Sequence, residues 1–165
     1  SRKTHGSAGV FDIDVFAAGA VECRKNGPTQ VLVAFDQVIQ QTTGTVNDVS
    51  ITSGTVSELV VNGNQLTVTM SGVTDVTLLT MAFPGMRNAG GTAVVQTLCF
   101  RVLLGDATGD GLTNVLDLLA IRNKLNMPVN NSNFTSDITG DGNINVLDLL
   151  ATRNNLNKNV AGSCP

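Results

Sequence analysis

The sequence predicts two modules, an all-β sandwich over residues 1–103 and a duplicated loop–helix module over residues 104–165. Three observations support this prediction. Short apolar or alternating runs separated by turn residues fill the first module, which is typical of antiparallel β structure. A segment at 106–117 returns at 137–148, and each copy leads into an apolar pattern with helical spacing. No proline-rich or glycine- and serine-rich linker separates the two modules, so we expect them to be rigidly coupled.

Seven short strands are expected in the first module. They lie at about 10–17, 30–36, 46–52, 56–62, 65–71, 75–83 and 92–103. Asn62-Gly63 between two of these runs is a hairpin signal. In the strand that follows, Leu66, Val68 and Met70 should face the core, because side chains alternate between the two faces of a strand. Strands with this spacing favour an immunoglobulin-like sandwich, and their order is left open.

The repeated segment has the residue pattern of an EF-hand-type calcium loop. Oxygen-bearing side chains stand at loop positions 1, 3, 5, 9 and 12, a carbonyl serves position 7, and position 6 is Gly. The expected ligands of the first loop are Asp106, Thr108, Asp110, the Leu112 carbonyl, Asn114 and Asp117. Those of the second loop are Asp137, Thr139, Asp141, the Asn143 carbonyl, Asn145 and Asp148.

The acidic residues of the second module are confined to these loops. Between Gly105 and Pro165 the six loop aspartates are the only carboxylate side chains, whereas a solvated surface would carry acids on helix faces as well. Three carboxylates in one loop repel each other until a divalent cation lies among them. Magnesium accommodates seven oxygen ligands poorly, and zinc prefers His and Cys. We therefore expect two calcium ions per chain; the alternative is a pair of Asp- and Gly-rich turns.

The Asp at position 12 and the duplication of loop plus helix resemble a type I dockerin. The segment Asn-Val-Leu-Asp-Leu-Leu-Ala-x-Arg-Asn-x-Leu-Asn, shared by 114–126 and 145–157, adds to this resemblance, which covers roughly residues 104–159. It implies two calcium ions, two antiparallel loop–helix units related by a pseudo-twofold axis, and docking onto a cohesin module. The opening Ser-Arg-Lys-Thr-His-Gly-Ser-Ala-Gly is similar to the start of β-plus-dockerin regions of bacterial surface proteins, and it assigns no residue a role.

The sequence departs from the dockerin pattern at two places. Position 3 is Thr in both loops, where Asn or Asp is usual, and this removes a favourable ligand. Positions 10 and 11, often Ser-Thr at the cohesin-contacting surface, are Val115-Leu116 and Val146-Leu147. The second departure bears on cohesin docking rather than on calcium binding.

Composition and charge exclude several classes of function. The net charge is −3 and no basic stripe is present, so the electrostatic footprint of a nucleic-acid-binding protein is missing. No apolar run approaches the roughly 18 residues of a membrane span. The single histidine, His5, is expected in a polar arm, which leaves no base for a Ser–His or Cys–His nucleophile. The chain has no Trp or Tyr on which a sugar could stack, and we expect no enzymatic activity.

An extracellular, cell-surface location is expected, because calcium loops of this type suit surroundings in which calcium is plentiful. The three cysteines are consistent with an oxidising compartment. They can form one disulfide at most, and Cys99 could be reached either by the loop that carries Cys23 or by the tail that carries Cys164. The sequence leaves this choice open.

Each helix carries more apolar surface than one interface needs. Stripes that would bury the two units against each other are formed by Leu118, Ile121 and Leu125, and by Leu149, Thr152 and Leu156. A second apolar face is formed by Val115, Leu116 and Leu119, and by Val146, Leu147 and Leu150. For one copy we expect this face to pack against the β module, and for the other to meet another chain.

Two functions from different classes follow. The main interpretation is a non-enzymatic structural subunit of a surface fibre or layer, built from identical subunits. In it, residues 10–17 either complete their own sandwich or pair with the sheet edge of the next subunit. The alternative is a dockerin-type anchor that attaches a larger secreted protein, such as a polysaccharide-degrading enzyme, to a cohesin-bearing scaffold.

Overall fold

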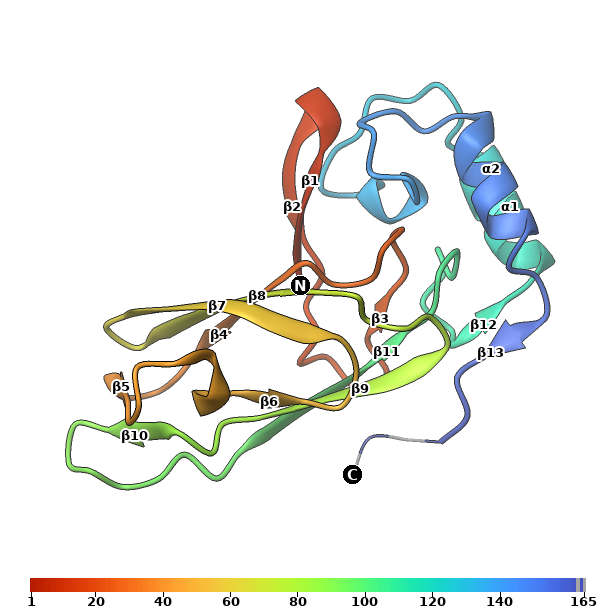
Figure 1. Ribbon diagram of the computed structural model, residues 1–165. Helices are drawn as coiled ribbons and strands as arrows, with labels where there is room; N and C mark the ends of the chain where they lie inside the picture. The colour runs from red at the N-terminus through yellow and green to blue at the C-terminus, as the bar shows by residue number, and fades with distance from the viewer. Residues whose placement is uncertain (163, 165) are drawn as a thin grey trace.

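The computed structural model describes residues 1–162 and residue 164 of the chain. A β-sheet-rich region at the N-terminal end is followed by a segment with two short helices, as the sequence predicts (Figure 1). Within the described residues, no helix is long and apolar enough to cross a membrane.

Eleven strands precede the first loop, and most of them are short. They are β1 (Arg2–His5), β2 (Gly9–Asp12), β3 (Val21–Glu22), β4 (Gln30–Ala34), β5 (Ile39–Gln41), β6 (Ser50–Ile51), β7 (Thr55–Asn62), β8 (Gln65–Ser71), β9 (Thr77–Ala82), β10 (Met86–Asn88) and β11 (Thr97–Val102). Two single-turn 3-10 helices lie among them, η1 (Gly6–Ala8) and η2 (Val46–Asp48).

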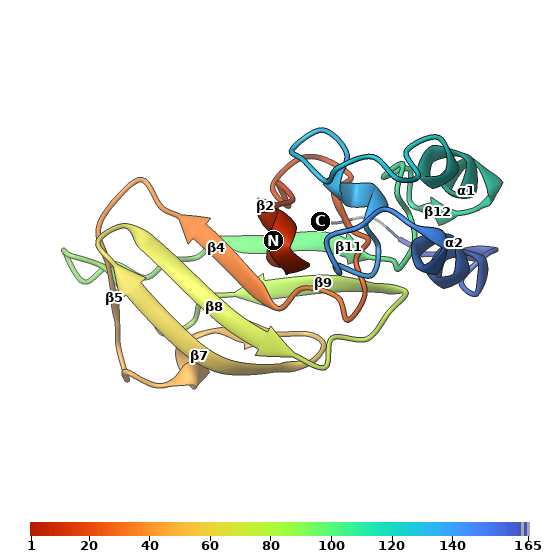
Figure 2. The same cartoon turned by 90° about the horizontal axis from the view of Figure 1, so that it is seen from above.

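Two sheets face each other across one hydrophobic core. The first has the strand order β2-β1-β4-β8-β7 and the second β3-β11-β9-β6, while β10 and β5 form a separate pair (Figure 2). The predicted hairpin is confirmed, since β7 and β8 pair antiparallel with Asn62 opposite Gln65 and Gly63 in the left-handed region at φ 63°. Leu66, Val68 and Met70 are buried as expected, at 0%, 0% and 2% exposure.

The N-terminal segment differs from the prediction. His5 was expected in a polar arm, yet it lies in β1, which pairs with both β2 and β4 and extends the first sheet. The strand expected at 10–17 ends at Asp12 and completes the sheet of its own chain. The reason lies in distant polar partners: His5 is fully buried, and the Ser1 carbonyl accepts hydrogen bonds from Ile13 and Arg24.

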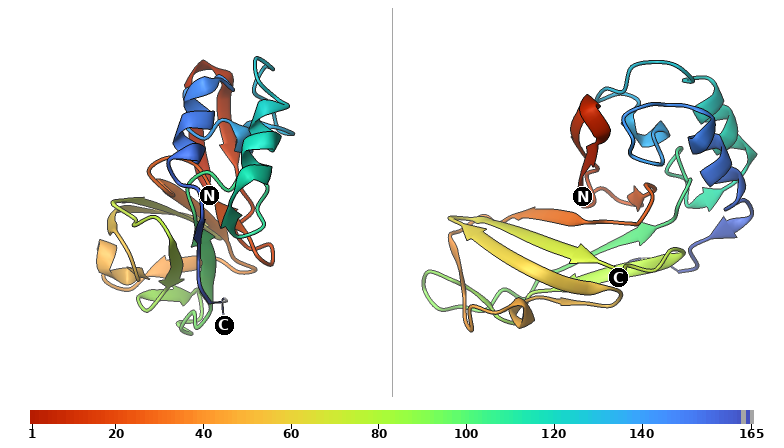
Figure 3. Two further views of the ribbon diagram at one scale, coloured as in Figure 1. Left: turned by 90° about the vertical axis from the view of Figure 1, so that its right-hand side faces the viewer. Right: turned by 45° about the horizontal axis from the view of Figure 1, so that its top comes forward.

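The C-terminal segment consists of two similar loop–helix units. Its elements are β12 (Leu112–Thr113), α1 (Val115–Arg122), η3 (Phe134–Ser136), α2 (Val146–Arg153) and β13 (Lys158–Asn159). The helices lie side by side at the end of the molecule away from β5 and β10 (Figures 1 and 3). The short ribbon of β12 and β13 pairs the strand before α1 with the strand after α2, so the two units close on each other.

The two halves of the chain share a second hydrophobic cluster. Val21, Cys23 and Leu103 from the β region pack there with Ile121 and Ile138, and further members are Ile144 and Val160. Only Leu103, Leu104 and Gly105 lie between the end of β11 and the first residue of the first loop, Asp106. The division of the chain at 103/104 stays a prediction, and this cluster shows that the two parts pack directly against each other.

Polar contacts reinforce this junction. The Asp75 carboxylate accepts hydrogen bonds from the Leu104 N–H at 2.7 Å and from the Asn155 amide at 2.7 Å. Lys158 Nζ lies 3.4 Å from the same carboxylate. One loop of the sandwich therefore contacts both the start and the end of the helical segment.

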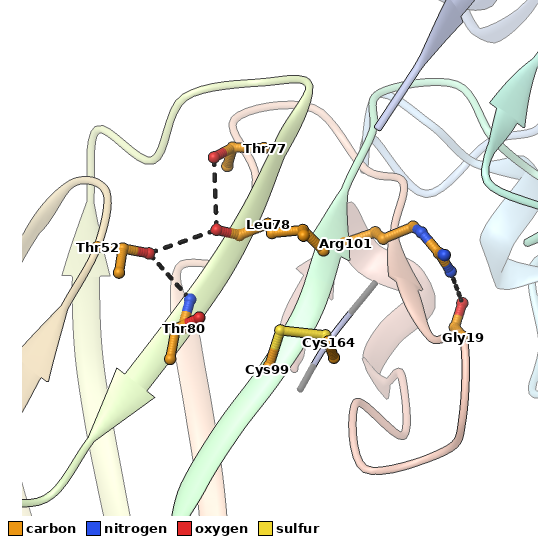
Figure 4. The surroundings of a disulfide bond; sticks show 8 residues. All are labelled: Gly19, Thr52, Thr77, Leu78, Thr80, Cys99, Arg101 and Cys164. Atoms are coloured by element: carbon orange, nitrogen blue, oxygen red, sulfur yellow. Dashed lines mark hydrogen bonds between the residues drawn. A yellow bond between two sulfur atoms is a disulfide. The ribbon is translucent and has the colours of Figure 1, made fainter. Parts of the chain in front are cut away.

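A disulfide joins Cys99 of β11 to Cys164 of the tail, which decides the pairing that the sequence left open (Figure 4). The two Cα atoms are 5.5 Å apart and the bond spans 65 residues. Cys23 is a free, buried thiol, and its Sγ lies 3.6 Å from the Thr135 carbonyl oxygen.

Candidate metal loops and the adjacent helix face

The first residue of each loop binds the loop backbone. In the first loop, Asp106 Oδ1 accepts hydrogen bonds from the N–H groups of Gly109 at 2.7 Å and Asp110 at 3.1 Å, and Oδ2 accepts from Gly111 at 2.7 Å. Gly111 at position 6 has φ 86°, and its counterpart Gly142 has φ 88°. These values lie in the left-handed region, so both sharp turns require glycine.

The last residue of each loop closes it from the first turn of the helix. Asp117 accepts hydrogen bonds from the N–H of Asn114 at 2.8 Å and from the Thr108 hydroxyl at 2.8 Å. Asp148 does the same in the second loop, where the Thr139 hydroxyl lies 3.0 Å from its Oδ1. Both aspartates are fully buried and complete a capping box at the helix N-terminus. The threonine at position 3 thus holds the position-12 carboxylate.

The donor set of each loop suits a hard divalent cation, since it contains carboxylate, hydroxyl, amide and carbonyl oxygens and no nitrogen or sulfur ligand. Burial raises the pKa of Asp106, and the neighbouring carboxylates of Asp117 and Asp110 raise it further. Burial also raises the pKa of Asp148, with Asp137 acting in the same direction. A bound cation would relieve this repulsion.

Among the described residues, no three His, Cys, Asp or Glu side chains form a group poised to hold a metal ion. The carboxylates at positions 1 and 12 are instead held by N–H and O–H donors of their own loops. The ligand roles predicted for the twelve loop residues therefore stay predictions, and the chemistry of the donors fits calcium.

The second loop has a partner that the first one lacks. His5 Nδ1 lies 2.8 Å from Asp137 Oδ2, and both side chains are fully buried. Burial acts to raise the pKa of Asp137, but hydrogen bonds from His5 and from the Gly142 N–H outweigh it and lower the pKa below its usual value. The expectation that His5 lies in a polar arm is wrong. No local sequence signal could have placed it, because 132 residues separate the two partners.

The second apolar face is exposed on both helices. Its members are Val115 (68% exposed), Leu116 (55%), Leu119 (48%), Val146 (68%), Leu147 (53%) and Leu150 (46%). The expectation that the sandwich covers one copy is wrong, because both helices turn the opposite side inward, where Ile121 and Thr152 are fully buried.

A groove runs between the two helices, with a volume of about 550 Å³. Its apolar lining comes from both helices, and one arginine of each helix completes it. The lining residues are Val115, Leu118, Leu119, Arg122, Val146, Leu149, Leu150 and Arg153.

The family model of the dockerin type I domain matches residues 104–159, which contain both loops, both helices and the face between them. Residues 104–159 are a type I dockerin domain. The predicted resemblance is thereby confirmed. The match does not include a catalytic domain.

Among solved structures, the chain is similar to an N-terminal interface mutant of a type II cohesin–X–dockerin complex from Acetivibrio cellulolyticus. The identity is 16%, with 81% of this chain and 99% of that chain covered and a TM-score of 0.30. This likeness is too weak to place any element of the β region. No curated protein matches the chain.

Proposed function

We propose that this chain is a non-enzymatic, extracellular docking module that binds a cohesin-type partner in a calcium-dependent manner. The observation that carries the proposal is the apolar face that α1 and α2 expose in duplicate beside their groove. The dockerin type I match supports an anchoring role, in which the module attaches a larger secreted protein to a cohesin-bearing scaffold.

The chemistry of this face indicates what it would bind. Leu116 and Leu147, in the first turns of α1 and α2, expose more than half of their surface, and such apolar patches on protein surfaces mark interaction sites. Burial of apolar surface is favourable by roughly 25 cal/mol per Å². Arg122 and Arg153, the last residues of the two helices, are the charged residues in the lining of the groove. We therefore propose a partner surface that is apolar at its centre and carries acidic groups at its rim.

Calcium would act through the helices. Asp117 and Asp148 are at once the predicted position-12 ligands and the capping partners of α1 and α2. A cation in each loop would neutralise the carboxylates that crowd beneath the helix N-termini. Docking should therefore fail when calcium is removed, because the apolar face would lose its shape.

The proposal is tested with a panel of type I and type II cohesin domains, measured by calorimetry with calcium and with a chelator. The intact chain should bind one class, and the double variant Leu116→Glu/Leu147→Glu should lose at least about 100-fold in affinity, as two hot-spot residues would. Val60→Glu is the matched control, since Val60 is 47% exposed on β7, away from the groove. Absence of binding to every cohesin at saturating calcium would overturn the proposal.

The fibre interpretation receives no support from the dockerin match. The segment expected to exchange between subunits pairs within its own sheet, through β2 with β1 and through β1 with β4. We therefore propose the anchor in place of the fibre. Light scattering of the purified chain in millimolar calcium distinguishes the two, since a fibre subunit would form open-ended assemblies and an anchor would not.

A further inference from the structure

We infer that the hairpin of β1 and β2 contributes to calcium binding by the second loop, with His5 as a positioning residue for Asp137. The two loops, almost identical in sequence, would then differ in calcium affinity. The inference rests on the calcium binding proposed above, and it assigns a role to the N-terminal hairpin.

The hydrogen bonds of His5 determine its orientation. Arg24 Nη1 lies 3.2 Å from His5 Nε2, and a guanidinium can only donate, so Nε2 accepts and Nδ1 donates to Asp137. Arg24 is itself held by Glu22 through two bonds of 2.7 Å. All four side chains are at most 1% exposed. The imidazole is thus aimed at a predicted calcium ligand by a chain of buried partners.

Aromatic rings enclose the imidazole. The ring centroids of Phe11 and Phe134 lie 5.3 Å and 5.9 Å from that of His5, both edge-on. Phe11 belongs to β2, and Phe134 belongs to η3 just before the second loop. In Figures 1 and 3 the hairpin stands beside the segment that carries η3. This packing excludes water from the bond to Asp137 and restricts rotation of the ring.

The hairpin backbone also lies directly against the loop backbone. A Cβ atom on Gly6 would lie 2.0 Å from the Asp141 carbonyl oxygen, and a Cβ on Gly142 would lie 2.7 Å from the His5 carbonyl oxygen. Asp141 and Gly142 are positions 5 and 6 of the second loop. The hairpin therefore holds this loop at its position-1 side chain and at the backbone of its sharp turn.

The first loop has no such support. Asp106 Oδ2 corresponds to the oxygen that His5 binds, and among the described residues its hydrogen bond comes from the Gly111 N–H alone. The atoms nearest to a Cβ on Gly111 would belong to the flexible side chain of Arg101, at 3.5 Å or more, and not to backbone. The difference between the loops thus comes from their surroundings.

A hydrogen bond from outside the ligand set orients the ligand and raises metal affinity, and loss of such a bond typically costs 10–100-fold. The second loop should therefore bind calcium more tightly than the first. Coupling between two equilibria is reciprocal, so calcium in the second loop should in turn stabilise the β1–β2 hairpin.

The test measures each loop separately. Asp110 and Asp141 are exposed position-5 residues, so Asp110→Ala isolates the second loop and Asp141→Ala isolates the first. In the Asp110→Ala background, His5→Ala should weaken calcium binding by about 10–100-fold in calorimetry. In the Asp141→Ala background it should leave calcium binding unchanged. His5→Asn should restore part of the affinity, because its amide nitrogen can take the place of Nδ1.

A second measurement leaves His5 intact, in case His5→Ala does not fold. Hydrogen exchange of residues 2–12 is followed during calcium titration of the two single-loop variants. Calcium in the second loop should increase the protection of the hairpin, and calcium in the first loop should not. Equal responses of the two loops, or an unchanged affinity after His5→Ala, would overturn the inference while calcium binding stands. If the intact chain binds no calcium at all, both this inference and the proposed function fail.

Discussion

The side chains of Glu22 and Arg24 form a fully buried ion pair. Burial acts to raise the pKa of Glu22, but the hydrogen bonds and charge of Arg24 outweigh it and lower the pKa below its usual value. Lys3 and Ser1 also face this carboxylate and act in the same direction. Because the folded-state pKa is depressed, the pair stabilises the fold above the pKa of the unfolded chain, about 4.3, and this contribution is lost as the pH falls below it.

The predicted consequence is a pH-dependent effect of Glu22→Gln. Near neutral pH the variant should lose about 3 kcal/mol in its free energy of unfolding, since Arg24 is left buried without a counter-charge. The difference from the unmodified chain should shrink as the pH falls below about 4. Urea unfolding across this pH range measures it, with Asp12→Asn as the control, because Asp12 forms the half-exposed pair with Arg2. A pH-independent difference would contradict the assignment.

The Cys23 thiol should be unreactive in the folded chain. Its side chain is 1% exposed, and burial raises the pKa of its thiol well above the usual range, with Glu22 acting in the same direction. The thiolate is the reactive form. Maleimide labelling without reductant should therefore proceed only at the rate of unfolding, and it should be immediate in denaturant. Rapid labelling of the native chain would show that this region opens locally.

At the scale of elements, α1 and α2 are too short to persist alone. Each has eight residues, below the roughly 12–15 that an isolated helix needs in water. Their capping boxes use the aspartates that the loops would present to calcium. The helices therefore depend on the loops and on packing against the β region.

Calcium removal should unfold these helices and leave the sandwich folded. A chelator should abolish most of the helical far-UV circular dichroism signal, while the β signal of residues 1–103 persists, because the sandwich has a hydrophobic core of its own. Magnesium at the same concentration is the control, since it suits a seven-ligand loop poorly. A helical signal unchanged by the chelator would contradict the calcium assignment of both loops.

At the scale of the whole molecule, the tail ties the helical segment back onto the sandwich. Cys164 follows β13 and forms a disulfide with Cys99 of β11 (Figure 4). β11 pairs there with β9, in which Thr80 lies opposite Cys99. The shared cluster around Leu103 and the contacts of Asp75 act at the same junction. The dockerin domain is thus fixed to the sandwich at both of its ends.

The double variant Cys99→Ser/Cys164→Ser should lower the free energy of unfolding by about 2–4 kcal/mol, because the disulfide closes a long loop in the unfolded chain. Guanidinium unfolding measures the loss. Cys23→Ser is the control, and its effect should not depend on an added reductant. If the unmodified chain is equally stable with and without reductant, the disulfide does not hold the tail in solution.

Local spacing in the sequence was sufficient to predict the features that depend on near neighbours. Asn62-Gly63 and the alternation after it predict the β7–β8 hairpin, since register and turn type are local properties. The loop pattern and the position-12 aspartates predict both loops and the helix starts, because the expected ligands and the capping residues lie within twelve residues of chain.

Features that depend on contacts between residues far apart in the sequence were decided only by the tertiary structure. It joined Cys99 to Cys164, brought His5 to Asp137 across 132 residues, and left the apolar faces of Leu116 and Leu147 both exposed. Periodicity shows that a helix has two apolar faces, but it carries no information on which face the rest of the chain covers. Nor does it show which buried donor meets which carboxylate, because that pairing is set when the sheets and loops pack together. The two predicted calcium loops are therefore alike in sequence and unlike in their surroundings.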